Sequence, residues 1–253
     1  MRSFAFCFAL GLSLPSVSQE EKPKPGSHEV FYVRYGRSGK MSLQRQDAQG
    51  RELGSIDLRG HGFPSRLRAT AEGTLLLSGQ GGIVEIDREG KELQKIAPEK
   101  GKWEMALDAH PLPNGNILAT LIRGQRTFIA ELDREGKILR EVTPKLEGKM
   151  PGIRSASPSG EDRLLIATLT GVTEIDWEGE KQFEYGPDRG GYCYDVHPLP
   201  NGNFLYVGSI PGGVKAGIVA EITRDGEKLW SGSHGCPTSV QPLSNGNVLV
   251  GGG

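Results

Sequence analysis

Short apolar runs alternate with turn residues over nearly the whole chain. Beyond residue 20, the longest run free of both glycine and proline is Gln125–Glu135. An average soluble helix is about as long as that run, so the pattern excludes a helical bundle and a doubly wound α/β fold. Ile117–Ile122 is a continuous apolar run suited to a buried strand, whereas Phe128–Asp133 alternates apolar and polar residues like a half-buried strand. We therefore expect an all-β chain.

Two kinds of turn divide the chain into repeating units. The segments Asp108–Asn116 and Asp195–Asn203 are nearly identical, and Gln241–Asn247 is a related copy. Each contains Asn-Gly, which supplies the positive φ angles of a tight hairpin. Turn glycines of this first kind recur every 42 to 45 residues, at Gly73, Gly115, Gly160, Gly202 and Gly246. A second turn, mostly Asp-x-x-Gly, lies between them and ends at Gly50, Gly90, Gly136, Gly179 and Gly226.

A repeat of about 43 residues with two turns is typical of four-stranded antiparallel β-propeller blades. Residues 30–57 supply the last three strands of a blade, residues 236–252 supply the first two, and four complete blades lie between them. Pairing the final units would close a five-bladed ring and leave Asn247–Val250 over. The alternative, which we favour, has six blade registers with incomplete terminal blades. In that case we also consider that the chain is a piece of a longer propeller.

The N-terminal segment has the features of a secretory signal peptide. Met1-Arg2 precedes the apolar stretch Phe4–Leu14, and small residues follow. We predict a signal peptide over residues 1–18, a linker over residues 19–28 and a single propeller domain over residues 29–253, in a secreted or periplasmic protein. No later apolar stretch is long enough to span a membrane.

Composition and charge narrow the partners. The chain has 37 glycines and 36% hydrophobic residues, enough to fill a core, so the glycines indicate turns rather than disorder. The 30 Lys and Arg and 31 Asp and Glu residues are interspersed, which provides no basic face for nucleic acid. We expect a small molecule or a protein to bind at a mouth of the propeller channel.

The turn motifs resemble those of exported bacterial propellers. Pro-Asn-Gly-Asn and Asp-Arg-Glu-Gly-Lys are similar to turns of the pyrroloquinoline-quinone-like, arylsulfotransferase-like and NHL-type propellers. Thr223–Trp230 is similar to the tryptophan-docking turn of the quinoprotein repeat, but the equivalents of Trp230 are Gly54, Gln94, Arg140 and Phe183. Quinone-dependent dehydrogenases of this kind need a larger ring and commonly a vicinal cysteine pair, so we expect no cofactor. The arylsulfotransferase-like resemblance implies a histidine nucleophile in the channel.

Aligned on the first turn glycine, polar residues fall into three columns. Five residues before the glycine stand Arg68, His110, Ser155, His197 and Gln241. Seven residues before it, on the same face of the strand, stand Arg66, Asp108, Ile153, Asp195 and Ser239. Twelve residues before it stand His61, Trp103, Gly148, Gly190 and His234. We expect these columns to converge on one mouth of the channel, where propellers usually bind ligands.

These columns supply the candidate functional residues. The candidates for ligand binding are His61, Trp103, Asp108, Asp195 and His234. His110, His197 and Arg68 are the catalytic candidates, a histidine acting as nucleophile or base and Arg68 steadying an anion. The competing hypothesis is that each Asp-x-His pair is structural, with the aspartate holding the histidine tautomer. A binding module without catalysis is our leading hypothesis, and a channel-mouth transferase or hydrolase is the alternative.

Other conspicuous residues suggest structural roles. Cys193 and Cys236 are candidates for a disulfide, although they stand at different distances from their turn glycines. A glutamate precedes most of the second turns, at Glu85, Glu131, Glu174 and Glu221, where we expect pairing between blades or a solvated face. No spacing of histidines or cysteines indicates a metal site.

Overall fold

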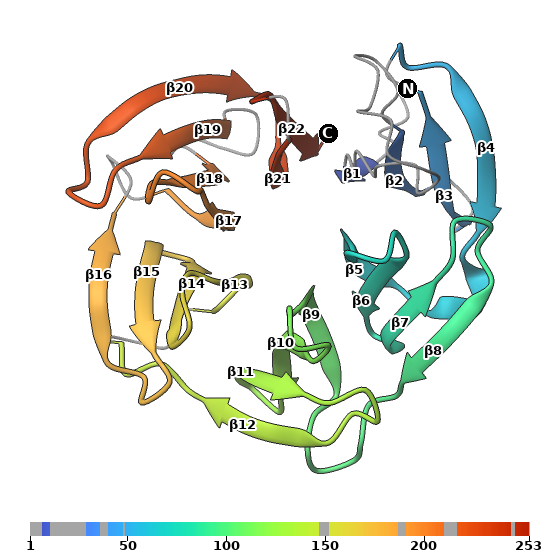
Figure 1. The fold of residues 1–253 in the computed structure, drawn as a ribbon, viewed down its shortest axis with the longest axis horizontal. Helices are drawn as coiled ribbons and strands as arrows, with labels where there is room; N and C mark the ends of the chain where they lie inside the picture. Colours follow the sequence, from blue (N-terminus) through green and yellow to red (C-terminus); the bar gives the residue numbers. More distant parts are fainter. Residues whose placement is uncertain are drawn as a thin grey trace.

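The computed structural model is a ring of antiparallel β-sheets around a central axis (Figure 1). It describes residues 7–10, 29–35, 40–47, 49–146, 152–186, 191–209, 217–243 and 246–252. The predicted fold class, a β-propeller of four-stranded antiparallel blades, is confirmed. Nowhere in these described ranges is there a helix with the length and apolarity that crossing a bilayer requires.

The first three blades follow one another along the chain. Blade 1 contains β1 (Cys7–Leu10), β2 (Val30–Tyr35), β3 (Met41–Gln46) and β4 (Glu52–Asp57). The short 3-10 helix η1 (Arg59–His61) leads into blade 2, which contains β5 (Pro64–Ala69), β6 (Leu75–Gly79), β7 (Gly82–Ile86) and β8 (Glu92–Ile96). Blade 3 contains β9 (Met105–Pro111), β10 (Ile117–Arg123), β11 (Arg126–Leu132) and β12 (Ile138–Val142).

The remaining strands form two full blades and one two-stranded sheet. Blade 4 contains β13 (Ser155–Pro158), β14 (Arg163–Thr168), β15 (Gly171–Asp176) and β16 (Lys181–Tyr185). Blade 5 contains β17 (Cys193–Pro198), β18 (Phe204–Ser209), β19 (Gly217–Ile222) and β20 (Lys228–His234). The last sheet contains β21 (Pro237–Pro242) and β22 (Val248–Gly252).

The first blade is complete, whereas we expected an incomplete blade at each end of the repeat. Blade 1 has a fourth, innermost strand, β1, which pairs with β2 and lies against β21 and β22. Because β21 and β22 keep a sheet of their own, the described strands occupy six registers, as favoured, and do not close a five-bladed ring. Strand β1 lies within the predicted signal peptide, whose removal stays a prediction, and the predicted linker over residues 19–28 is outside the described residues.

The Asn-Gly turn positions the end of each inner strand. In blade 3, the Leu112 N–H donates to the Asn116 carbonyl at 2.8 Å, and the Asn116 N–H donates to Oδ1 of Asn114 at 3.0 Å. Gly115 has a φ of +86°, and a Cβ added there would meet nothing within 4 Å. The positive φ alone therefore favours glycine at this position.

The Asp-x-x-Gly turn has a second reason for its glycine. Oδ1 of Asp87 accepts hydrogen bonds from the N–H groups of Glu89 at 3.0 Å and Lys91 at 2.8 Å, which closes the turn. Gly90 has a φ of +88°, and a Cβ there would collide with Ile56 of blade 1. This turn therefore sets the close approach of one blade to the next.

Two of the four glutamates before this turn, Glu85 and Glu174, pair with the neighbouring blade as predicted, whereas Glu131 and Glu221 bind residues of their own blades. Glu85 in β7 accepts a hydrogen bond from Arg134 in the turn of blade 3. Glu174 in β15 accepts one from Nη1 of Arg224 in the turn of blade 5, at 2.7 Å. In both blades the arginine at the second position of the turn thus reaches back to the preceding blade.

One tryptophan takes part in a junction of this kind, and another binds within its own blade. Nε of Arg140 donates to Oε2 of Glu131 at 2.8 Å, and its guanidinium lies 3.9 Å from the centroid of the Trp177 ring in blade 4. In blade 5, Nε1 of Trp230 donates to Oε2 of Glu221 at 2.8 Å. The docking role of tryptophan is therefore filled differently from one blade to the next.

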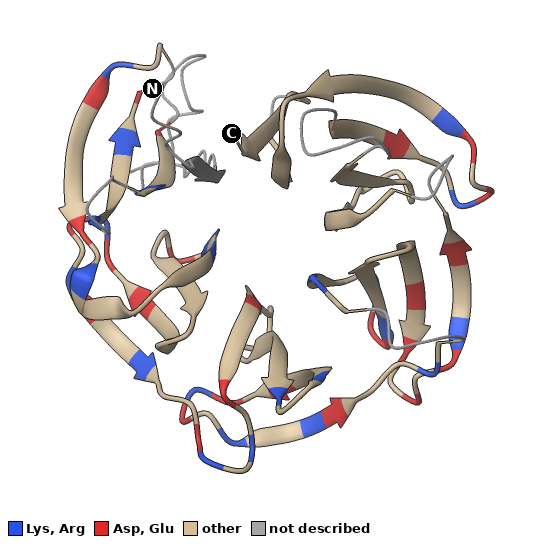
Figure 2. Ribbon diagram, turned by 180° about the vertical axis from the view of Figure 1, so that it is seen from behind, with Lys and Arg blue, Asp and Glu red and all other residues tan. Residues whose placement is uncertain are grey.

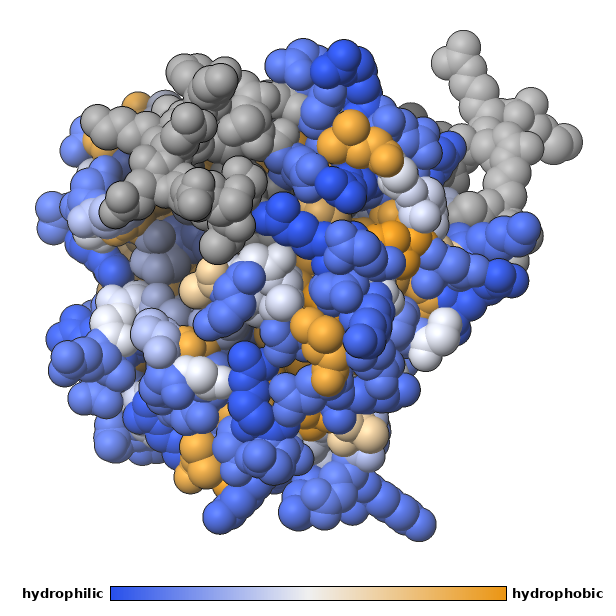
Figure 3. Space-filling view, turned by 45° about the vertical axis from the view of Figure 1, so that its right-hand side comes forward, coloured by the Kyte–Doolittle hydropathy of each residue, from blue (hydrophilic) through white to orange (hydrophobic). Residues whose placement is uncertain are grey.

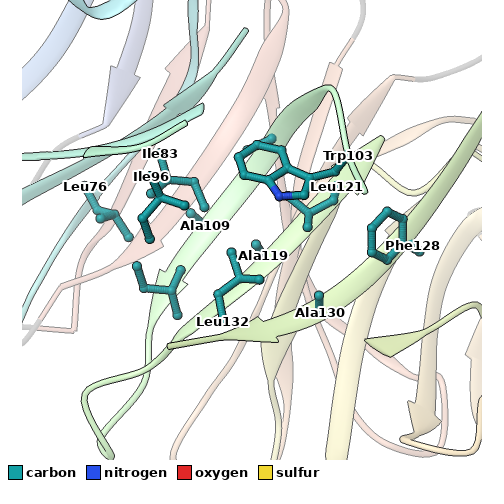
Figure 4. Packing of buried hydrophobic residues seen from close by; sticks show 12 residues of the cluster. Leu76, Ile83, Ile96, Trp103, Ala109, Ala119, Leu121, Phe128, Ala130 and Leu132 are labelled. Atoms are coloured by element: carbon teal, nitrogen blue, oxygen red, sulfur yellow. The ribbon is translucent and has the colours of Figure 1, made fainter. Parts of the chain in front are cut away.

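Apolar side chains fill the space between blades. Figure 4 shows Leu76, Ile83 and Ile96 of blade 2 in the same cluster as Trp103 and Leu121 of blade 3. Trp103 is only 2% exposed. Charged residues lie along the outer strands and the turns (Figure 2), and the face seen in Figure 3 is mostly hydrophilic with scattered apolar residues. The core is thus a series of interfaces between neighbouring sheets. The channel runs along the axis that these sheets surround.

Candidate functional site

The inner strands of the six sheets surround the axis of the ring (Figure 1), and five of them, β5, β9, β13, β17 and β21, contain the residue columns described above. Their pairing with the second strands fixes an alignment that differs from the sequence prediction in blade 4. Ser157 pairs with Leu165 as His110 pairs with Leu118, so Ser157, and not Ser155, occupies the histidine position.

The misalignment in blade 4 comes from its turn. The Ser159 N–H donates to the Arg163 carbonyl, as Leu112 does to Asn116, so this turn corresponds to residues 159–163. Gly160 is not among the glycines with positive φ, and the equivalent of Gly115 is Asp162. Ser155 therefore stands at the aspartate position, where Ile153 was predicted. Gly148 and Gly190, from the third predicted column, lie outside the described residues.

Arg68 joins three strands across the channel. Its Nη2 lies 2.9 Å from Oδ2 of Asp108 in β9 and 2.9 Å from Oδ1 of Asp195 in β17. Its Nε lies 3.2 Å from Oδ1 of Asp108, and its Nη1 lies 2.5 Å from Nε2 of His197. The side chain of Arg68 is 4% exposed, and those of the two aspartates are 1% and 0% exposed. This network is a buried ionic cluster that spans the axis.

The cluster keeps its carboxylates charged. Burial would raise the pKa of Asp195, but Arg68 and Arg66 more than offset this effect and lower it to about 2. Burial also opposes ionisation of Asp108, and the charge of Arg68 again holds its pKa far below the usual range. The two negative charges are therefore permanent partners of the arginines.

The same contacts keep the histidines neutral. Arginine N–H groups only donate, so Nε2 of His197 accepts from Arg68 and the ring proton is on Nδ1. Burial and the charge of Arg68 lower the pKa of His197 to about 3, and the same two causes lower the pKa of His110. The two rings lie 5.4 Å apart, and Nε2 of His110 is 3.2 Å from Oγ of Ser157.

Arg66 ties the mouth of the channel together. Its Nη2 donates to the carbonyl oxygen of Tyr194 at 2.5 Å, and its Nη1 donates to that of Thr238. Oδ2 of Asp195 accepts from the N–H of Val240 at 3.1 Å. The aspartates thus bind Arg68 from another strand, and the predicted partners His110 and His197 lie 3.6 and 4.0 Å from them. This arrangement supports the structural hypothesis, with an arginine added to the predicted partners.

A cavity of about 630 Å³ opens at the end of the channel where the inner strands begin. Strands β5, β9, β17 and β21 each carry a β-bulge near this end. The bulged residues and the equivalent residue before β13 all line the cavity: Ser65, Leu107, Arg154, Tyr194 and Thr238. A repeated irregularity of the backbone therefore presents five different side chains to one space.

The rest of the lining is aromatic, apolar and cationic. The rings of Tyr35 and Phe63 stack with centroids 5.6 Å apart. Tyr35 donates a hydrogen bond to the Pro64 carbonyl, and burial raises its pKa to about 12, so the phenol is neutral. Arg66 and Arg154 are the charged residues of the lining, and among the described residues no aspartate or glutamate lines it.

The predicted ligand residues lie elsewhere. Nδ1 of His61, in η1, is 3.4 Å from Oε2 of Glu92. Trp103 is packed between blades, and His234 ends β20, opposite Gly217. None of these residues lines the cavity, and neither do Asp108 and Asp195.

The catalytic candidates and the cysteines also lie away from the cavity. Arg68, His110 and His197 do not line it. Cys193 and Cys236, the candidates for a disulfide, are not bonded to each other in the structure. Cys193 is buried and lies 3.6 Å from the carbonyl oxygen of Asp195, which orients it along its own strand. In the described ranges, no group of three or more histidine, cysteine, aspartate or glutamate side chains is placed to hold a metal ion.

Comparisons with known proteins identify the fold and no family. No family model matches the chain, and no curated protein matches its sequence. A protein of unknown function from Bacteroides caccae is similar in structure, with a TM-score of 0.65, 18% identity, and coverage of 98% of this chain and 82% of that chain.

Two further solved structures have known roles. Inactive virginiamycin B lyase from Staphylococcus aureus with quinupristin has a TM-score of 0.55 and 15% identity, over 97% of this chain and 88% of that chain. A chain of a nidogen/laminin complex has a TM-score of 0.57 and 13% identity, over 80% of this chain and 74% of that chain. At these identities the similarity is one of fold.

Proposed function

We propose that this protein is a binding module that takes a small molecule into the cavity at the mouth of its channel. The observation that carries this proposal is the set of four bulges and the equivalent position before β13, which together direct five unlike side chains into one cavity of about 630 Å³. Protein cavities that bind small molecules have volumes of roughly 300–1,000 Å³. The turn and strand residues next to these five side chains repeat from blade to blade, because the fold requires them. The fold does not require the five side chains themselves to differ. The predicted signal peptide supports the further proposal that binding takes place outside the cytoplasm.

The alternative, an enzyme using His110 or His197, has less support from the geometry. A nucleophile or general base needs a free lone pair within reach of the substrate. Nε2 of His197 already accepts from Arg68, and neither histidine lines the cavity. The structural neighbours include a lyase and a protein that binds another protein, so the fold itself is compatible with either role.

A neutral fluorescent dye tests the proposal. N-phenyl-1-naphthylamine brightens in apolar sites, and we expect saturable binding to the purified protein. Leu107→Trp fills the cavity and should weaken the dye at least about tenfold. Leu93→Trp is the matched control, because Leu93 is also a bulged leucine but lies 50% exposed on the outer strand β8. Equal dye binding by both variants, with unchanged thermal unfolding, would contradict the proposal.

A further inference from the structure

The charge of the cavity indicates what kind of molecule it takes. In the floor of the channel, two arginines face two aspartates whose pKa values stay low, and the neighbouring histidines are neutral. Arg66 and Arg68 are therefore balanced by Asp108 and Asp195. Arg154 adds one positive charge at the mouth that no carboxylate of the lining balances.

Arg154 is placed to contact a ligand. It precedes β13 at the position of the bulges, and its side chain is exposed at the cavity. Within the described part of the chain, no ion pair involves its guanidinium. Because an unpaired guanidinium offers parallel N–H donors to two neighbouring oxygens of an anion, this residue provides a ready contact for a carboxylate or a sulfonate.

Arg66 adds a second, fixed donor. It is 7% exposed, yet it lines the cavity. Two of its nitrogens are held by the carbonyl oxygens of Tyr194 and Thr238, which anchor the guanidinium without neutralising it. A guanidinium that is immobilised before binding loses little conformational entropy when an anion arrives.

The remaining walls favour an aromatic or otherwise apolar body. Tyr35 and Phe63 form a stacked pair on one side, and Tyr194 and Leu107 come from the inner strands of other blades. Ser65 and Thr238 provide hydroxyl groups between them. Apolar walls around a few placed polar groups are the usual composition of a small-molecule site.

We propose that the ligand is an organic anion with a single negative charge and an aromatic or apolar body, an inference that rests on the proposed function. Arg154 and Arg66 hold the anionic group, and the aromatic walls hold the body. The one surplus charge favours a carboxylate, sulfonate or sulfate ester over a multiply charged phosphate. Molecules with a positive charge are excluded by the same two arginines.

Two dyes with the same ring system test this inference. 8-Anilinonaphthalene-1-sulfonate is N-phenyl-1-naphthylamine with one added sulfonate, so the ratio of their affinities isolates the contribution of the charge. We expect the sulfonate to bind about tenfold more tightly, the effect of one partly exposed charge-assisted contact. Raising the salt concentration should reduce this preference and leave the neutral dye unaffected.

Arg154→Met is the decisive variant, because Arg154 is exposed and its removal leaves the buried cluster intact. It should weaken the sulfonate about tenfold and change the neutral dye less than about twofold. Arg51→Met is the control, since Arg51 pairs with Asp47 on an outer turn with 78% of its side chain exposed.

The outcomes separate the two proposals. Neutral dye binding that is sensitive to Leu107→Trp, without a preference for the sulfonate or without an effect of Arg154→Met, overturns the inference and leaves the proposed function standing. A sulfonate preference that survives Leu107→Trp places the anion outside the cavity and also overturns the inference. Absence of binding by both dyes overturns both proposals.

Discussion

Replacing Arg68 by methionine should test the ionic cluster of the channel directly. The substitution keeps an unbranched side chain of similar length and removes the cation from between Asp108 and Asp195, which are 1% and 0% exposed. Three nitrogen–oxygen contacts of 2.9 to 3.2 Å are lost. Both carboxylates keep a backbone N–H donor, so the loss is partial.

The magnitude follows from the cost of an unpaired buried charge. Removing one partner of a buried ion pair costs about 3–5 kcal/mol, so we expect the free energy of unfolding at pH 7 to fall by roughly 4 kcal/mol. For a protein of this size that corresponds to a decrease in Tm of roughly 8–16 °C. Urea unfolding followed by circular dichroism measures the free energy, with Arg51→Met as an exposed control expected to change it by less than about 1 kcal/mol.

The pH dependence distinguishes an ionic cause from lost packing. In the unaltered protein the pKa of Asp195 is depressed to about 2, so its stabilisation is present above the unfolded pKa of roughly 3.9 and disappears as the pH falls toward 2. Without Arg68 the buried carboxylates take up protons more readily, so acid relieves their cost. The difference between the two proteins should therefore shrink between pH 7 and pH 4.5.

A rescue experiment completes this test. Adding Asp108→Asn to Arg68→Met leaves Asp195 as the one carboxylate beside the remaining Arg66, and should restore most of the lost free energy at pH 7. The reasoning is refuted if Arg68→Met alone costs less than about 1 kcal/mol, or if its cost is the same at both pH values.

Three further predictions concern single residues. His197 should stay neutral in the folded protein down to about pH 4, because its pKa is lowered to about 3, and nitrogen NMR of the ring should show the proton on Nδ1. This histidine should also make the protein less stable as the pH falls from roughly 6.5, its unfolded pKa, toward 3. Trp103→Ala should reduce the free energy of unfolding by about 3–5 kcal/mol in urea titrations, because the ring is 2% exposed between two blades; a loss below about 1 kcal/mol would contradict its core position. Burial raises the pKa of Cys193, so iodoacetamide should modify Cys236 and spare Cys193 in the native state. Mass spectrometry of the digested protein measures the modification of each cysteine. Equal modification of the two would contradict the burial of Cys193.

The blade architecture was predictable because it depends on local chemistry. A glycine at positive φ, such as Gly115, marks its turn whatever the rest of the chain does. The exception is Gly160, which lies in a turn of blade 4 without adopting positive φ, so that alignment on glycine shifted the columns by two residues. Hydrogen-bond register, unlike glycine spacing, identifies Ser157 as the equivalent of His110.

The contacts across the channel were beyond a repeat-based prediction. Arg68 and Asp195 are 127 residues apart in the sequence. They belong to different columns, which stand five and seven residues before the turn glycine. Repetition predicted that each aspartate would serve the histidine of its own strand. Each aspartate does lie near that histidine, but the single arginine in the histidine column also attracts both aspartates, because one buried cation requires buried negative charge beside it.

The cavity residues were missed for a geometric reason. Strict alternation places a residue directly before Asp108 on the face opposite to the channel. The bulge adds a residue to the strand and turns Leu107 toward the cavity, and the same displacement applies to Tyr194 and Thr238. The available signal was variation itself, since the position eight residues before the turn holds a different residue type in each unit.

This geometry separates the residues that hold the ring from those that meet a ligand. Arg68 and the two aspartates are coupled to one another across the channel, so a change at one alters the partners of the others. The bulged side chains are not coupled across the channel in this way. Arg66 donates its hydrogen bonds to the backbone carbonyl oxygens of Tyr194 and Thr238, which a residue of any type supplies. Substitution at a bulge can therefore change the chemistry of the cavity at little cost in stability, and a repeat protein can acquire a ligand specificity without altering its repeat.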